Sequence, residues 1–283
     1  MKEKEHKILN HPILGYFLLM IFSLVIAGIL SYVIDNMILA RMIPGYAVTQ
    51  KIGGMERPQA SGIGLAIGAV LSIGLFYIWF RPSFNGMLKK KDFIKGLLFL
   101  APILIIHWIG SIISWAQFGT ASIFLAFLRA FAPGFGEEAA FRGLGVANYL
   151  RRDPTEKGIV KIFWLSSIVF GLVHVANAFA GAPLLISVGQ AAYAAGMGMV
   201  FGAVYLRTGT LWPSILGHMS ADFMEFIRAD LGSTGGVMSG IGLGDWITII
   251  AGTIGIFWGL YLIRPAKRSE IVELWKSKWS AEV

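Results

Sequence analysis

Long apolar stretches alternate with short polar segments along most of the chain. A helical stretch of roughly 20 apolar residues is long enough to cross a bilayer. The pattern predicts about eight membrane-spanning helices, at about 13–34, 61–80, 96–118, 122–141, 162–180, 185–206, 210–228 and 246–263. Turn residues interrupt two of the longest apolar regions, at Gly119-Thr120 and at Gly181-Ala182-Pro183, and indicate short hairpins between antiparallel helices.

The composition supports this interpretation. The 283 residues are 56% hydrophobic and 14% charged, with a mean hydropathy of +0.69, whereas soluble domains carry about 25% charged residues. The chain has no cysteine, which excludes thiolate metal sites and a cysteine nucleophile. No internal repeat is evident. We therefore expect an all-α, polytopic membrane protein that forms one transmembrane helical domain over residues 1–283.

The distribution of basic residues predicts the orientation of this domain. If the N-terminus lies inside, the eight predicted spans place most of the 24 lysines and arginines on the cytoplasmic side, as the positive-inside rule requires. We therefore expect an integral protein of the cell membrane with both termini in the cytoplasm. The net charge of +8 is then a topology signal, and it gives no reason to expect a nucleic-acid partner.

Ionisable residues inside the predicted spans are few, and they are the candidates for chemistry. A carboxylate in a bilayer costs several kcal/mol unless it is paired or faces water, so such residues mark functional sites. Glu137 and Glu138 are adjacent in the fourth span, His174 lies in the fifth, and His218 and Asp222 lie in the seventh. The i,i+4 spacing places His218 and Asp222 on one helix face. Buried acids and bases at overlapping depths can activate a water for attack on a carbonyl.

The two glutamates are expected to differ in role. Adjacent residues differ by about 100° around a helix, so only one of the pair can face the same cavity squarely. The other, together with Arg142 about one turn later, can hold the first carboxylate by a charge-assisted hydrogen bond. His107 matches no such pattern and is interpreted as a helix-packing residue.

Three motifs on separate predicted spans resemble those of a known family. They are Glu-Glu-x-x-x-Arg (137–142), Phe-x-x-x-His (170–174) and His-x-x-x-Asp (218–222). In this order they are similar to the motifs of the CPBP family, the CAAX-protease and bacteriocin-processing intramembrane endopeptidases, which include the Rce1-type prenyl-protein proteases. The resemblance covers roughly residues 92–228, which we treat as a protease-like core.

The resemblance implies catalytic roles for four residues. Glu137 and His174 would activate the hydrolytic water, while His218 and the residue at 222 would stabilise the oxyanion. Position 222 is Asp here, where the prenyl-protease branch has Asn. An ionised carboxylate is a poor oxyanion donor, so Asp222 would have to be protonated, orient His218 or bind a metal.

The resemblance also implies supporting roles for Glu138 and Arg142 and leaves metal dependence open. Two histidines with carboxylates are plausible zinc ligands, and any such metal would be held by Glu137, His174 and His218. The chain has no His-Glu-x-x-His run, which excludes a zincin-type site. Water activated by a glutamate without a permanent metal is an equally good interpretation.

The predicted function is that of an intramembrane endopeptidase. Its partners would be membrane lipid and a peptide or lipidated-protein substrate, such as a prenylated CAAX-like protein. One alternative is a non-enzymatic membrane protein of the same fold, acting in bacteriocin self-immunity or as an interaction partner. Another is a proton-coupled transporter, since buried Glu and His also suit proton relays. The missing repeat makes a transporter less favoured.

Overall fold

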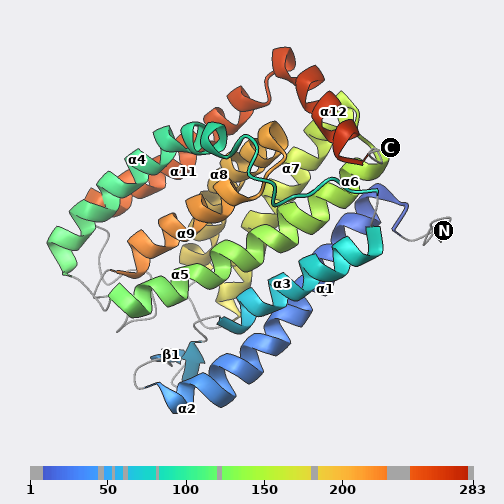
Figure 1. The fold of residues 1–283 in the computed structure, drawn as a ribbon. Helices are drawn as coiled ribbons and strands as arrows, with labels where there is room; N and C mark the ends of the chain where they lie inside the picture. The colour runs from blue at the N-terminus through green and yellow to red at the C-terminus, as the bar shows by residue number, and fades with distance from the viewer. Residues whose placement is uncertain are drawn as a thin grey trace.

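The protein is a bundle of helices with one short hairpin (Figure 1). The hairpin pairs β1 (Val48–Ile52) with β2 (Met55–Gln59) in antiparallel register. The predicted all-α class of the membrane bundle is confirmed, and the hairpin is an addition that the apolar pattern did not predict. The computed structural model describes residues 9–43, 48–52, 55–59, 63–80, 83–119, 123–179, 184–227 and 243–279.

Every predicted span coincides with a helical segment, although several bounds differ. The helices, with π-helical and 3₁₀ segments written η, are α1 (Pro12–Ser31), η1 (Tyr32–Leu39), α2 (Ala40–Met42), α3 (Ile63–Phe80), α4 (Phe93–Phe118), α5 (Ile123–Glu138), η2 (Ala139–Val146), α6 (Ala147–Arg152), α7 (Glu156–Val173), η3 (His174–Ala178), α8 (Leu184–Thr208), α9 (Trp212–Phe226), α11 (Leu243–Leu262) and α12 (Pro265–Trp279).

The number of helices able to cross a membrane is smaller than predicted. Among the described residues, four segments are long and apolar enough, namely Pro12–Met42, Ile63–Phe80, Phe93–Gln117 and Glu156–Ala178. A fifth is added if α11 and α12, which meet at a bend of 73°, count as one span. The predicted count of eight is therefore not confirmed.

The spans predicted at 122–141, 185–206 and 210–228 do not pass this test for a physical reason. Helix α9 has 15 residues, on the order of 22 Å at 1.5 Å per residue, which is shorter than a bilayer core. Helix α9 packs against α5, and α8 packs between α7 and α11. Helices enclosed by others need less apolar surface than helices that face lipid, and they have room for polar side chains.

Several other helices carry large exposed apolar side chains. Examples are Ile29 on α1, Ile78 on α3, Leu98 on α4, Leu172 on α7 and Phe257 on α11, each at least 60% exposed. Large exposed apolar side chains on this many helices are unusual for a soluble monomer. They support an integral membrane protein.

The segment that carries the glutamates extends beyond the predicted span. Helix α5 continues without interruption through η2 into α6, as far as Arg152, whereas the sequence pattern ended this span at residue 141. The pattern stopped because Arg142 is charged, yet Arg142 is completely buried. Its charge is paired inside the protein, so the helix continues past it.

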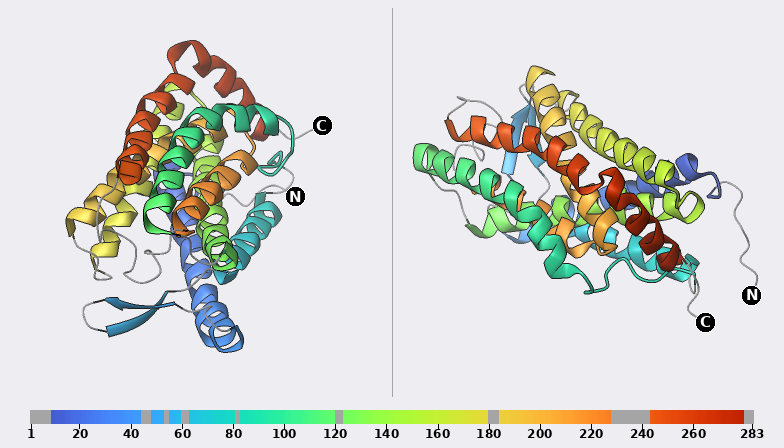
Figure 2. Two further views of the ribbon diagram at one scale, coloured as in Figure 1. Left: turned by 90° about the vertical axis from the view of Figure 1, so that its left-hand side faces the viewer. Right: turned by 90° about the horizontal axis from the view of Figure 1, so that it is seen from above.

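Helix α12 follows the predicted last span and was not expected. It contains Lys267, Arg268, Glu270 and other charged residues, so we place it outside the membrane-spanning segments. Figure 2 shows it turned away from the axis of α11 at the end of the bundle. The Trp275 indole is fully buried and donates to the Leu206 carbonyl, which anchors α12 to the end of α8.

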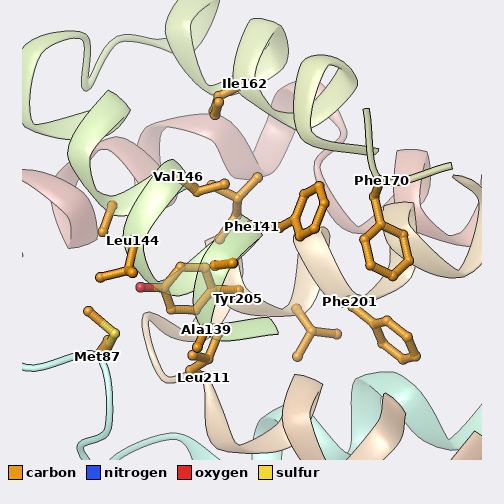
Figure 3. Close-up of a cluster of buried hydrophobic side chains, with 14 of the residues drawn as sticks. Met87, Ala139, Phe141, Leu144, Val146, Ile162, Phe170, Phe201, Tyr205 and Leu211 are labelled. Atoms are coloured by element: carbon orange, nitrogen blue, oxygen red, sulfur yellow. The ribbon is translucent and has the colours of Figure 1, made fainter. Parts of the chain in front are cut away.

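Aromatic and aliphatic side chains of the interior helices form the packed core beside the candidate site. Phe141 from η2 meets Phe170 from α7 edge-on, with ring centroids 5.1 Å apart. Phe201 from α8 belongs to the same buried cluster (Figure 3). Close-packed interiors of this kind hold side chains in fixed rotamers, so the core gives the neighbouring polar groups defined positions.

Candidate active site

A fully buried ion pair links the glutamate pair to the rest of the bundle. Arg142 Nη1 donates to Glu138 Oε1 at 2.9 Å, and Arg142 Nη2 donates to the Gly198 carbonyl at 3.2 Å. Both charged side chains have no exposed surface. The guanidinium also lies 4.0 Å from the ring centroid of Phe170, a favourable cation–π distance. Arg142 Nε and Glu138 Oε2 are buried without a hydrogen-bond partner among the described residues, so the pair is only partly satisfied and depends on these extra contacts.

Gly198 allows this approach. A Cβ at position 198 would lie 2.9 Å from Arg142 Nη2 and 3.0 Å from the ring of Phe170. Both distances are shorter than an ordinary van der Waals contact. The absence of a side chain on α8 therefore makes room for the guanidinium and the aromatic ring together.

His218 lies between two carboxylates. Its Nδ1 donates to Glu138 Oε1 at 3.1 Å, and its Nε2 lies 3.5 Å from Asp222 Oδ2. The ring stacks on Phe201 with centroids 5.4 Å apart, and His218 is buried. The sequence prediction that His218 and Asp222 share one helix face agrees with this geometry.

His174 approaches the same region from α7. It is the C-cap of this 18-residue helix, so it lies on the order of 27 Å along α7 from Glu156. Its Nδ1 lies 2.8 Å from the Phe170 carbonyl. Because a carbonyl only accepts, Nδ1 donates, and Nε2 of the neutral ring is left as an acceptor. Phe170 contacts both the His174 ring and the His218 ring, at 5.3 Å and 5.6 Å.

A cavity of about 70 Å³ brings three of the predicted residues together. This volume is more than one water needs. Three predicted residues line it: His174, His218 and Asp222. The remaining lining residues come mainly from α8 and are Phe170, Gln190, Tyr193, Ala194, Met197, Phe201 and Ala221.

The two glutamates point in different directions, as their spacing predicts. Glu138 faces His218 on α9, whereas Glu137 is partly exposed and makes no hydrogen bond through its buried Oε2. Neither glutamate is among the residues that line the cavity. Glu137 is nevertheless close enough for its charge to act on both His218 and Asp222.

The predicted metal ligands do not converge. Within the described parts of the chain, no group of three or more His, Asp or Glu side chains is arranged to hold a metal ion. His218 Nδ1 is engaged by Glu138, and His174 Nδ1 is engaged by a backbone carbonyl. In this arrangement Glu137, His174 and His218 do not fit a zinc site, because zinc needs at least three protein ligands around one point.

Sequence reasoning missed two polar residues of the cavity, Gln190 and Tyr193. They are uncharged, so a search for ionisable residues in apolar spans did not select them. One signal was available: residues 190, 193, 194, 197 and 201 recur at helical spacing and mark one face of α8. Only the fold shows that this face meets His174 and His218.

Comparison with known proteins agrees with the motifs. Residues 119–224 match the model of a family described as type II CAAX prenyl endopeptidase Rce1-like. Neither a curated protein nor a solved structure matches the chain. The matched segment contains the whole cluster from Glu137 to Asp222 and lies inside the protease-like core expected from the sequence. Residues 119–224 are therefore similar to the Rce1-like family of type II CAAX prenyl endopeptidases.

Proposed function

We propose that this protein is an intramembrane endopeptidase that hydrolyses one peptide bond of a membrane-associated substrate. The family match supports a CAAX-type protease. The observation that carries the proposal is the cavity where His174, His218 and Asp222 meet inside an apolar bundle. A small cavity lined by polar groups in such surroundings can hold the water that would attack a substrate carbonyl brought to it. The proposed substrates are prenylated CAAX-like proteins or small peptides.

We assign the general base to Glu137, assisted by His174. Glu137 Oε2 is buried and accepts no hydrogen bond in the described structure. Glu138 Oε2 is also without a partner among the described residues, but Glu138 Oε1 accepts from both Arg142 and His218, which holds this carboxylate in a supporting position. Glu137 has to approach the cavity water when substrate binds. Such tightening is common, because catalytic hydrogen bonds are often long in unbound enzymes.

The proposed reaction then follows ordinary acyl transfer to water. The base removes a proton from water as the water oxygen attacks the scissile carbonyl carbon. In the proposed scheme His218 is the imidazolium, with one proton on Nδ1 toward Glu138 and one on Nε2. The Nε2 proton stabilises the oxyanion that forms, in the manner of an oxyanion-hole donor. The base returns its proton to the leaving amine as the carbon–nitrogen bond breaks. Asp222, 3.5 Å from Nε2, orients the His218 ring.

Glu138 and Arg142 support this site without contacting the substrate. Glu138 accepts the Nδ1 proton of His218, which fixes the ring so that Nε2 points toward Asp222. Arg142 neutralises Glu138 and ties it to α8 through Gly198. The proposed steps use no metal ion, because the candidate ligands do not converge on one point.

We further propose that both termini lie in the cytoplasm. The basic residues of α12 and of the α6–α7 region, including Arg151, Arg152, Lys157 and Lys161, support this orientation by the positive-inside rule. Substrates would then be cleaved from the cytoplasmic side.

The proposal is tested with purified protein in phospholipid vesicles and a fluorogenic farnesylated peptide that ends in a CAAX sequence. We expect cleavage at one bond, identified by mass spectrometry of the products. A comparison of peptides from membranes with and without the protein extends the test to other substrates. If neither assay yields a product, the protein is not a protease, and a binding role for the same fold replaces this proposal.

A further inference from the structure

Two uncharged polar side chains on α8, Gln190 and Tyr193, line the cavity opposite the predicted catalytic residues. They are three residues apart, so they lie on the same helix face about one turn from each other. The family motifs include neither residue. Their hydrogen bonds to neighbouring helices fix which polar atoms remain available to a molecule in the cavity.

Tyr193 is oriented by His107, a fully buried residue of α4. His107 Nε2 lies 3.2 Å from the Ala221 carbonyl, and His107 Nδ1 lies 3.0 Å from the Tyr193 hydroxyl. The carbonyl can only accept, so Nε2 carries the proton and Nδ1 of the neutral ring accepts. The Tyr193 hydroxyl therefore donates to His107. The lone pairs of the Tyr193 oxygen remain, which makes Tyr193 a hydrogen-bond acceptor in the cavity.

Asn177, a residue of η3, orients Gln190 so that its donor end is left available, whereas Tyr193 is left as an acceptor. Asn177 Nδ2 donates to Gln190 Oε1 at 2.8 Å. The acceptor end of the Gln190 amide is thus engaged, and its Nε2 amide protons remain to donate. Segment η3 begins at His174, so the same short turn positions both the His174 ring and the Gln190 amide.

We propose that Gln190 and Tyr193 bind the backbone of the substrate peptide, an inference that rests on the proposed protease function. Gln190 donates to a peptide carbonyl and Tyr193 accepts from a peptide N–H. Every peptide backbone offers both groups, and in antiparallel pairing one extended residue exchanges both bonds with its partner. The face of α8 would thus take the place of a neighbouring strand.

Gln190 and Tyr193 together would hold the peptide beside His174 and Asp222. Because they bind backbone groups, they would not select among the substrate's side chains. His107, which lies in an apolar stretch of α4, would then have the function of fixing the direction of the Tyr193 hydroxyl. Gln190 and Tyr193 are binding residues in this scheme, and they take no part in proton transfer. Their loss should raise KM far more than it lowers kcat.

The test uses Tyr193→Phe and Gln190→Met, which remove the polar atoms and nearly preserve side-chain volume. Each should raise KM for the farnesylated CAAX peptide about 3- to 10-fold, the effect of one neutral hydrogen bond, while kcat stays within about twofold. Matched controls are Tyr261→Phe on α11 and Gln117→Met on α4, both at exposed positions away from the cavity. The controls should match the wild type in both constants.

Substrates with an ester in place of one non-scissile peptide bond identify the N–H that Tyr193 binds. At one position the ester should raise KM for the wild type and cause no further rise for Tyr193→Phe, because the same hydrogen bond is already missing. Wild-type KM values for both variants, or an ester effect of equal size in Tyr193→Phe, would overturn the inference. These outcomes require an active wild type, so they differ from the absence of cleavage, which refutes the proposed protease itself.

Discussion

Replacement of Arg142 by methionine should strongly destabilise the protein, because the buried carboxylate of Glu138 loses its arginine and keeps only His218 among its described partners. Both side chains lack any exposed surface. Removal of one partner from a buried ion pair costs about 3–5 kcal/mol. The Gly198 carbonyl loses its donor as well, which adds about 1 kcal/mol. Methionine is unbranched and fills most of the volume of the arginine side chain. The change in the free energy of unfolding therefore reports the lost charge.

The stability assay follows intrinsic fluorescence from the nine tryptophans, since a chain without cysteine cannot be followed by thiol-reactive dyes. Reversible unfolding in mixed detergent micelles gives the free energy of unfolding for each variant. The double variant Arg142→Met/Glu138→Met should recover part of the loss, because no buried carboxylate is then left without its arginine, while His218 Nδ1 loses its acceptor. Lys161→Met, at an exposed position on α7, serves as the control and should change stability by less than about 0.5 kcal/mol.

Two results would refute this reasoning. One is a loss below about 1 kcal/mol for Arg142→Met, which would mean that the charge of Glu138 is not buried. The other is a double variant whose loss equals the sum of the two single losses. Additivity of that kind would show that the two residues do not interact.

Three further predictions concern pH, helix packing and metal dependence. Burial lowers the pKa of Lys278 from its ordinary 10.5 to about 8. Between about pH 8 and 10.5 the unfolded chain therefore binds more protons than the folded protein, so the free energy of unfolding should rise with pH over this range. The rise should be absent from Lys278→Met. Gly196→Ala should lower the free energy of unfolding by about 1–3 kcal/mol or more, because a Cβ at position 196 would lie 2.0 Å from the Gly252 carbonyl oxygen. The control Gly189→Ala lies on the same helix and has no atom within 4 Å of its Cβ. It should leave stability unchanged. Cleavage should survive 1,10-phenanthroline and the purified protein should hold little metal; stoichiometric metal with chelator-sensitive activity would contradict the metal-free scheme.

The helices could be predicted from sequence more reliably than their ends or their relation to the membrane. Apolar runs located every long helix of the bundle except the charged α12, because twenty apolar residues have few alternatives to a buried helix. The helix through Arg142 was ended too early, because its neutralising partner and the Phe170 ring are contributed by tertiary structure. The short helix α9 was taken as a full span, because hydropathy does not reveal which helices are shielded from lipid by others.

The charged part of the site could be anticipated, and the uncharged part could not. His218 and Asp222 are four residues apart, and their contact at 3.5 Å follows from helical geometry. The contact between Tyr193 and His107 joins residues that are 86 positions apart in sequence. No local pattern encodes such a pair. Nothing in the sequence around Tyr193 or His107 distinguishes either of them from a residue that only packs. Only the folded bundle relates them to the cavity.

The most direct test of the account is the rate of peptide cleavage by Glu137→Gln in phospholipid vesicles. Loss of a general base lowers the rate by about 10²- to 10⁴-fold, and the isosteric glutamine should leave thermal unfolding unchanged. Glu273→Gln, at an exposed position on α12, should cleave the farnesylated CAAX peptide as the wild type does. Cleavage by Glu137→Gln at the wild-type rate would contradict the assignment of Glu137 as the residue that activates water.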